Sequence, residues 1–148
     1  MALYSWKVDY ALRTLLDLAQ QPPGQSAQAR DIATRQEIPE AYLTQLLVRL
    51  RQVGLVRSVR GAAGGYLLAR PPSQIRLGDV VRAFHDEDLL GPGPELPPAE
   101  SGSAAWVVRD VRSRLENAVR SILEGTTLAD LEEERRRLDE AQSMAIGI

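Results

Sequence analysis

The sequence has 148 residues, of which 44% are hydrophobic and 26% are charged, as is usual for a single globular domain or a domain with an appended oligomerisation element. It contains no cysteine, so disulfide bonds, thiolate catalysis, all-cysteine zinc sites and conventional iron–sulfur ligation are excluded. The net charge of −2 is unevenly spread, since residues 1–86 hold eleven Lys/Arg against seven Asp/Glu, and residues 87–148 hold seven Lys/Arg against thirteen Asp/Glu. This asymmetry suits a basic part that faces DNA, joined to an acidic part that does not contact the DNA phosphates.

Three helices are expected in the first part of the chain. The first runs from about residue 5 to 21 and is ended by Pro22-Pro23-Gly24. The second is short, over 29–36, and the third begins near Pro39 and ends before Gly54. Only a few residues separate the second helix from the third, which is typical of a helix-turn-helix.

The period of the apolar residues changes after Gly54. The stretch AYLTQLLVRLRQ places Leu43, Leu46, Leu47 and Leu50 at helical spacing. In the following text, LVRSVRGAAGGYLLARPP, two apolar runs at 55–59 and 66–69 flank a glycine-rich tip, which predicts a β-hairpin. A fourth helix is expected from Leu77 to about His85.

The second part is expected to begin with a linker and to continue as two helices. Residues 87–102 are rich in proline and glycine, and a long helix should follow over 103–124, with Gly125 as its stop. Apolar residues spaced 4, 3, 4, 3, 4 form an a/d seam on it, predicted to be a dimer interface: Ala104, Val108, Val111, Leu115, Ala118 and Ile122.

A last helix is expected to start at the capping box formed by Thr127 and Asp130. Glu132 with Arg136 and Glu133 with Arg137 would make i,i+4 pairs on it, and the tail at 143–148 is expected to fray.

These elements predict a mainly α fold with a small β-hairpin wing (α+β), a winged helix-turn-helix followed by a long dimerisation helix. The expected organisation is a DNA-binding domain over 1–86, a linker over 87–102, and a dimerisation helix with a C-terminal helix over 103–148.

The window 41–78 carries six arginines and no acidic residue. In the third helix Thr44 and Gln45 lie near the N-terminus, where recognition helices contact base edges. Arg49, Arg51 and Arg57 suit phosphate contacts, and Arg60 on the hairpin tip suits a narrow minor groove. The predicted DNA-binding residues are Arg35, Ala41, Tyr42, Thr44, Gln45, Arg49, Arg51, Arg57, Ser58, Arg60, Gly61, Gly64, Gly65 and Tyr66.

Each half of this pattern has a plain structural alternative. The leucine stripe can simply pack into the core while the polar face of the helix contacts only water, and RGAAGGY can be an ordinary hairpin turn. Their adjacency under uniform positive charge favours DNA binding.

The string IATRQEIPEAYLTQLLVRLRQVGLVRSVRGAAGGYLLARPPSQIRLGDVVRAF closely resembles the Rrf2 family of bacterial winged-helix repressors (IscR, NsrR and CymR type). The resemblance starts at DYALRTLLDLA and continues to about Phe84. It implies a homodimer on a palindromic operator, with Arg60 in the position of the minor-groove arginine. Thr44 stands where the iron–sulfur regulators of the family have a base-reading glutamate.

Sensors of this family hold an iron–sulfur cluster with three cysteines in the segment that corresponds to about 88–105, which has none here. Asp9 and His85 stand near positions that supply non-cysteine ligands in the family. Without thiolates they are interpreted as a charge near a helix start and a helix-end residue, so neither a metal nor a cofactor is predicted. Trp6, Phe84 and Trp106 are expected in the core or the dimer interface, with a ligand pocket as the less favoured alternative.

The leading hypothesis is a homodimeric repressor that binds double-stranded DNA without a cluster. The alternative is a regulator that acts through a protein partner or a small effector, with weak or conditional DNA binding. An enzyme is not expected, because one histidine and no cysteine leave little for catalysis. A cytoplasmic protein is predicted, since no apolar run approaches the roughly 18 residues of a membrane span and the N-terminus does not read as a signal peptide.

Overall fold

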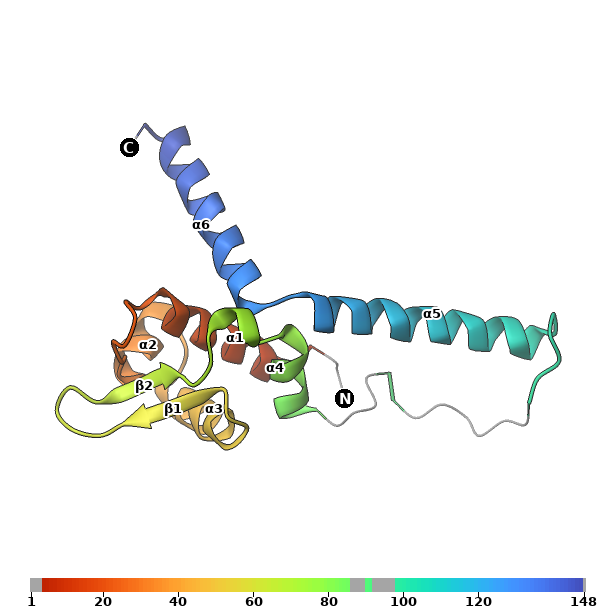
Figure 1. The fold of residues 1–148 in the computed structure, drawn as a ribbon, viewed down its shortest axis with the longest axis horizontal. Coiled ribbons are helices and arrows are strands. Elements are labelled where there is room, and N and C mark those ends of the chain that lie inside the picture. Colours follow the sequence, from red (N-terminus) through yellow and green to blue (C-terminus); the bar gives the residue numbers. More distant parts are fainter. Residues whose placement is uncertain (1–3, 86–89, 92–97, 148) are drawn as a thin grey trace.

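The computed structural model describes residues 4–85, 90–91 and 98–147. A helical head that carries a two-stranded hairpin is joined to two long helices that project from it (Figure 1). In chain order the elements are α1 (Trp6–Gln20), α2 (Ala29–Gln36), α3 (Glu40–Gln52), β1 (Val56–Val59), β2 (Gly65–Leu68), the 3-10 turn η1 (Pro72–Gln74), α4 (Leu77–Phe84), α5 (Ala104–Gly125) and α6 (Leu128–Ala145).

The core of the head is built from one apolar face of each of its helices. Leu15 of α1, Ile32 of α2 and Leu47 of α3 are fully buried together, and Val80 of α4 closes the cluster. Burying such a side chain contributes about 1.5–3 kcal/mol each. The fold is therefore the mainly α winged helix-turn-helix that the sequence predicts.

Local signals set the ends of the helices. Gln21 is held in an extended conformation because it precedes Pro22, which ends α1. Glu37 adopts a left-handed conformation at φ 55°, and this turns the chain between α2 and α3. Pro39 is the N-cap of α3, so the helix starts one residue later than the sequence predicts.

The junction between α5 and α6 is tied into the head by the main chain. The Leu77 amide donates to the Thr126 carbonyl at 2.8 Å, and the Leu128 amide donates to the Ile75 carbonyl at 2.8 Å. Leu123 and Leu128 are buried in the core of the head. The C-terminal helices are thus fixed to the head at their junction, while the N-terminal half of α5 extends away from it (Figure 1).

Side chains brace the same junction. Glu124 accepts hydrogen bonds from Arg82 at 2.5 Å and from Arg76 at 3.3 Å, and Arg82 also reaches Asp79 at 3.2 Å. Gly78 sits beneath this cluster, where a Cβ would lie 2.8 Å from Arg82 Nη1 and 2.9 Å from Glu124 Oε1.

The start of the C-terminal helix is as predicted, but one side-chain pair and the end of the helix differ. The predicted capping box is confirmed, since Thr127 and Asp130 exchange hydrogen bonds at 2.9 and 3.1 Å. Glu132, however, is buried at the base of α6 and pairs with Arg135 at 2.8 Å, three residues along, rather than with Arg136, four residues along. The predicted fraying of residues 143–148 is wrong up to Ala145, where α6 ends.

Most of the predicted linker, residues 87–89 and 92–97, lies outside the described residues.

Of the aromatic residues expected in the core or the dimer interface, Phe84 is partly buried and packs against the core. Trp6 is 49% exposed and Trp106 is 43% exposed, so these two lie outside the core, and their place in a dimer interface stays a prediction. None of the helices in the part of the chain that the structure describes is long and apolar enough to cross a membrane.

Replacing Glu124 with Gln should reduce the acid sensitivity of folding. The hydrogen bond from Arg82 holds the pKa of the Glu124 carboxyl below its ordinary value of 4.5. Its contribution to the free energy of unfolding is therefore complete above pH 4.5 and is lost as the pH falls through the lowered pKa. Because the carboxylate is half-exposed, the loss at neutral pH should stay below about 1 kcal/mol.

Urea unfolding followed by circular dichroism at a series of pH values tests this expectation. The difference in unfolding free energy between the parent chain and Glu124→Gln should shrink toward low pH. A difference that is the same at neutral and acid pH would contradict it.

Candidate nucleic-acid interface

Helix α3 presents two chemically distinct faces. Leu43, Leu46, Leu47 and Leu50 are buried against the other helices of the head. The opposite face is exposed and carries Ala41, Tyr42, Thr44, Gln45, Val48 and Arg49. The leucine stripe therefore decides which side chains α3 offers to a partner.

Thr44 and Gln45 differ in how they are already engaged. The Thr44 hydroxyl donates to the Glu40 carbonyl at 2.9 Å, so toward a partner it can only accept a hydrogen bond or offer its methyl group. Gln45 lies exposed and has no hydrogen-bond partner among residues 4–85, 90–91 and 98–147. Its amide can form the bidentate pair with adenine that the sequence analysis expects.

Tyr42 is engaged with the start of α1. Its ring packs edge-on against the Trp6 ring with centroids 5.2 Å apart, and Trp6 packs in the same way on Tyr10 at 5.7 Å. Tyr42 remains 48% exposed, so it packs α3 against α1 and can also contact a partner at the surface.

The hairpin is fixed to the head by a segment that sequence analysis missed. Ala27, just before α2, exchanges two main-chain hydrogen bonds with Tyr66, at 3.0 and 2.8 Å, and so forms an isolated antiparallel bridge on the edge of β2 that β1 does not cover. Ser26 also donates to the Ala63 carbonyl at 2.9 Å. A single bridge has no periodic pattern of residues, so nothing in the amino-acid sequence predicts it. Tyr66 is consequently half-buried against the core.

Two glycines allow close main-chain approaches, one within the hairpin tip and one between β2 and Ala27. A Cβ on Gly64 would lie 2.3 Å from the Val59 carbonyl oxygen, and one on Gly65 would lie 2.4 Å from the Ala27 carbonyl oxygen. The strands pair in antiparallel register, Ser58 with Tyr66 and Val59 with Gly65, so the tip that carries Arg60 and Gly61 is held at a defined place.

The structure divides the six arginines of the window 41–78 into two groups. Arg49 donates to the Ala83 carbonyl at 2.7 Å, Arg70 contacts Gln74 and Asp79, and Arg76 contacts Glu124. The side chains of the other three have no hydrogen bond or ion pair within the described part of the chain, and all three residues are exposed: Arg51, Arg57 and Arg60.

Arg35 has an internal partner that the sequence analysis did not anticipate. Its guanidinium donates to both oxygens of Asp17, at 2.9 and 2.8 Å, and Gln36 donates to the same carboxylate. The hydrogen bond with Asp17 raises the pKa of Arg35 above its ordinary range. Since Asp17 is 2% exposed, this pair neutralises a buried charge between α1 and α2.

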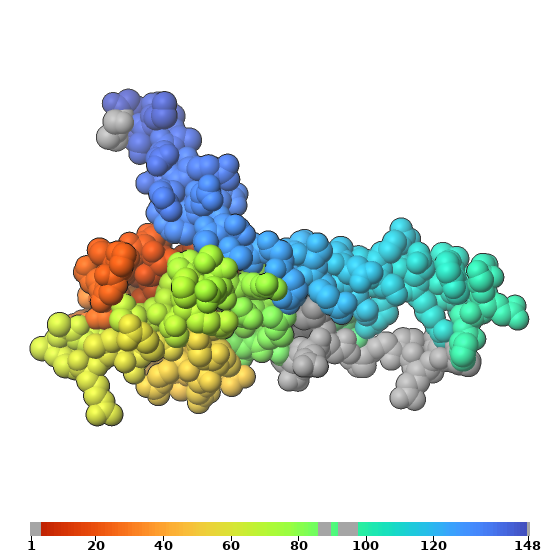
Figure 2. Space-filling model, viewed as in Figure 1, coloured from red at the N-terminus to blue at the C-terminus, as the bar shows by residue number. Residues whose placement is uncertain are grey.

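α3 and the hairpin occupy one side of the molecule, and α6 projects from the other (Figure 1). The space-filling view shows the yellow hairpin next to α3 at the lower left of the head (Figure 2). Arg51 belongs to α3, Arg57 to β1 and Arg60 to the hairpin tip, so all three lie on elements of this side, whereas the acidic α6 projects from the other side.

Asp9 lies in the first turn of α1, and His85 is the C-cap of α4. Among the described residues, no group of three His, Cys, Asp or Glu side chains could hold a metal ion.

Comparisons with known proteins agree with this architecture. Residues 4–134 match the Rrf2 family model, described as an iron-dependent transcriptional regulator. A putative HTH-type transcriptional regulator of Synechocystis is 40% identical over 141 residues, which cover 95% of each chain. Among solved structures, T. potens IscR has a TM-score of 0.72 and 35% identity, covering 89% of this chain and 87% of its own. CymR, the global cysteine regulator of B. subtilis, has a TM-score of 0.71 and 35% identity over 90% of this chain and 98% of its own.

The donor set of this chain does not fit an iron–sulfur cluster. The sequence has no thiolate to offer and a single histidine. The iron dependence in the family description is therefore not carried over to this chain through cysteine ligation.

Replacing Gly64 with Ala should displace the hairpin tip. The new methyl group would press on the Val59 carbonyl, a main-chain atom that cannot move alone, so the tip must shift. We expect DNA affinity to fall about tenfold or more, with helical content retained. Fluorescence anisotropy with labelled operator DNA measures the affinity, and circular dichroism measures the helical content.

Ala62→Ser is the matched control, because residue 62 lies exposed in the same tip. Equal affinities for the two variants would contradict a role for the tip geometry.

Proposed function

The chain belongs to the Rrf2 family of transcriptional regulators, and we propose that it is a cytoplasmic repressor that binds an inverted-repeat operator as a homodimer, without an iron–sulfur cluster. Each subunit places α3 in a major groove and the hairpin tip beside it. The proposal is carried by one observation: α3, with its exposed polar face, and the hairpin share one side of the molecule, and they carry three arginines whose side chains have no partner in the described chain.

Each part of this surface has a task that its chemistry supports. Gln45 reads a base edge, and the Thr44 methyl group packs against a thymine methyl. Arg51 and Arg57 contact phosphates, and Arg60 enters the flanking minor groove. Arg49 also lies on the exposed face, where its hydrogen bond with Ala83 leaves the terminal guanidinium nitrogens available to a phosphate. Arg35 positions α2 through Asp17.

The seam of α5 supports the homodimer. All six predicted seam residues are exposed, with Val108 at 69%, Leu115 at 54% and Ile122 at 60%. A helix with so long an apolar stripe is stable in water when a partner covers it. A second copy of the same helix covers it with a self-complementary surface and sets the spacing of two reading heads.

Arg60→Ala should weaken operator binding about tenfold and flatten the preference for A·T pairs beside each half-site, because the minor-groove potential attracts the guanidinium. Anisotropy titrations on the protein's own upstream DNA, near physiological salt with excess non-specific competitor, measure both effects.

Arg114→Ala is the control for this variant, since it removes the same charge from an exposed side chain on α5. Unchanged affinity in Arg60→Ala would remove the tip from the interface. Parent binding that falls to the non-specific level would favour the alternative in which a protein partner or effector is required.

Leu115→Glu should convert the dimer into a monomer by burying an unpaired charge in the seam. Light scattering coupled to size exclusion should give twice the chain mass of 16.3 kDa for the parent and the single-chain mass for the variant. Leu138→Glu, at a residue 64% exposed on α6, is the matched control and should remain dimeric. A monomeric parent chain would overturn the proposed assembly.

A further inference from the structure

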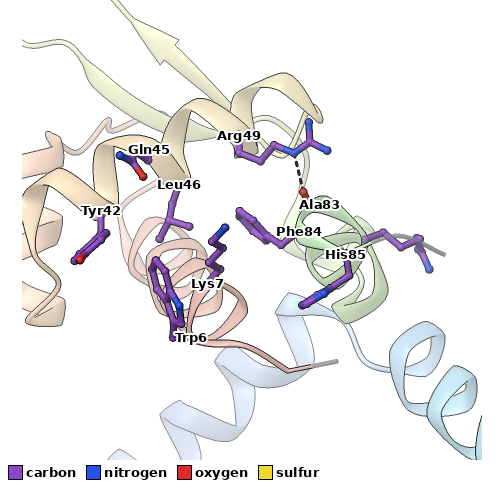
Figure 3. Close-up of a pocket in the computed structure, with 10 residues that line it drawn as sticks. Trp6, Lys7, Tyr42, Gln45, Leu46, Arg49, Ala83, Phe84 and His85 are labelled. Carbon is purple, nitrogen blue, oxygen red and sulfur yellow. Dashed lines mark hydrogen bonds between the residues drawn. The ribbon is translucent and has the colours of Figure 1, made fainter. Parts of the chain in front are cut away.

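A cavity of about 380 Å³ lies between the start of α1, one edge of α3 and the end of α4 (Figure 3). Its volume is in the range of small-molecule sites. The DNA-binding proposal assigns no ligand to this cavity.

The charged side chains that line the cavity are all basic: Lys7, Arg49 and Arg82. Arg82 is compensated by Glu124 and Asp79. Lys7 and Arg49 have no carboxylate partner among the described residues, and no carboxylate is found among the described residues that line the cavity. Two uncompensated cations in a concave site attract an anion.

The rest of the lining is suited to an apolar group. The rings of Trp6, Tyr42 and Phe84 border the space together with Leu46 (Figure 3). The Lys7 ammonium lies 5.8 Å from the centre of the Trp6 ring, so the anion-binding charge stands beside an aromatic wall.

His85 lines one end of the cavity, but its Nε2 is buried and is not presented to the cavity, so no ligand contact is assigned to this atom.

We propose that this cavity binds a small organic anion, one carboxylate, sulfonate or phosphate group on an aromatic or aliphatic body, and that the bound anion weakens DNA binding. Lys7 and Arg49 hold the charged group, and Trp6 and Phe84 hold the apolar body.

The link to DNA follows from shared residues. Tyr42, Gln45 and Arg49 border the cavity and also belong to the exposed face of α3 that the preceding proposal assigns to DNA. A ligand that engages Arg49 withdraws it from phosphate and adds a negative charge beside the duplex. By thermodynamic linkage, DNA must weaken ligand binding by the same factor.

Anilinonaphthalene sulfonate is a suitable probe, because it joins an aromatic body to one anionic group and fluoresces when bound. The chain has two tryptophans, so Trp106→Phe leaves Trp6 as the only energy donor. In this background we expect saturable energy transfer from Trp6 to one dye per chain.

Lys7→Gln should weaken dye binding about tenfold, and Lys7→Arg should restore most of it. Arg114→Gln, which removes a charge on α5, should leave dye binding unchanged. The uncharged analogue N-phenylnaphthylamine should bind more weakly than the dye and should not respond to Lys7→Gln. An equal dye affinity in the parent and in Lys7→Gln, as expected if the dye binds to the apolar seam of α5, would overturn the site.

The dye titration uses the free protein, so its failure leaves the DNA-binding proposal intact. A second titration, with labelled operator, tests the regulation that rests on that proposal. Saturating dye should weaken operator binding at least threefold in the parent and much less in Lys7→Gln. Unchanged operator affinity with dye bound at Lys7 would overturn the regulatory role.

Discussion

Burial of the leucine stripe of α3 fixes which side chains this helix presents to solvent. Once Leu43, Leu47 and Leu50 are packed into the head, the rotation of α3 about its axis is fixed. The same packing then determines that Thr44 and Gln45 face outward. A small rotation of α3 would expose leucine and bury amide, at a cost of several kcal/mol for each exchange.

A second constraint links the reading surface to the assembly. The hydrogen bonds between residues 75–77 and 126–128, with the Arg82–Glu124 pair beside them, leave little freedom between the head and α5. If α5 pairs with its copy, the distance between the two α3 helices is set by this junction. Helix α4 lies between the junction and the proposed anion cavity, so one short helix borders both.

Much of the fold follows from sequence because its signals are local. The stripe of α1, the prolines at 22 and 23 and the Thr127–Asp130 capping box each act over a few residues, and the structure matches them to within one or two positions. The exposed face of α3 follows from the same periodicity. Glu132 shows the limit: its pairing with Arg135 depends on burial at the base of α6, which the charge pattern of the helix alone does not reveal.

Sequence patterns are enough to predict the order of helices and hairpin, the concentration of arginine near α3 and the absence of thiolate ligands. The packing of the chain is needed to show which arginine side chains lack a partner among the described residues, that Ala27 anchors the hairpin and that Lys7 and Arg49 line the same cavity. The reason is physical. Periodicity and capping are short-range properties of one segment, whereas the partner of a long charged side chain is chosen by the packing of segments far apart in the chain.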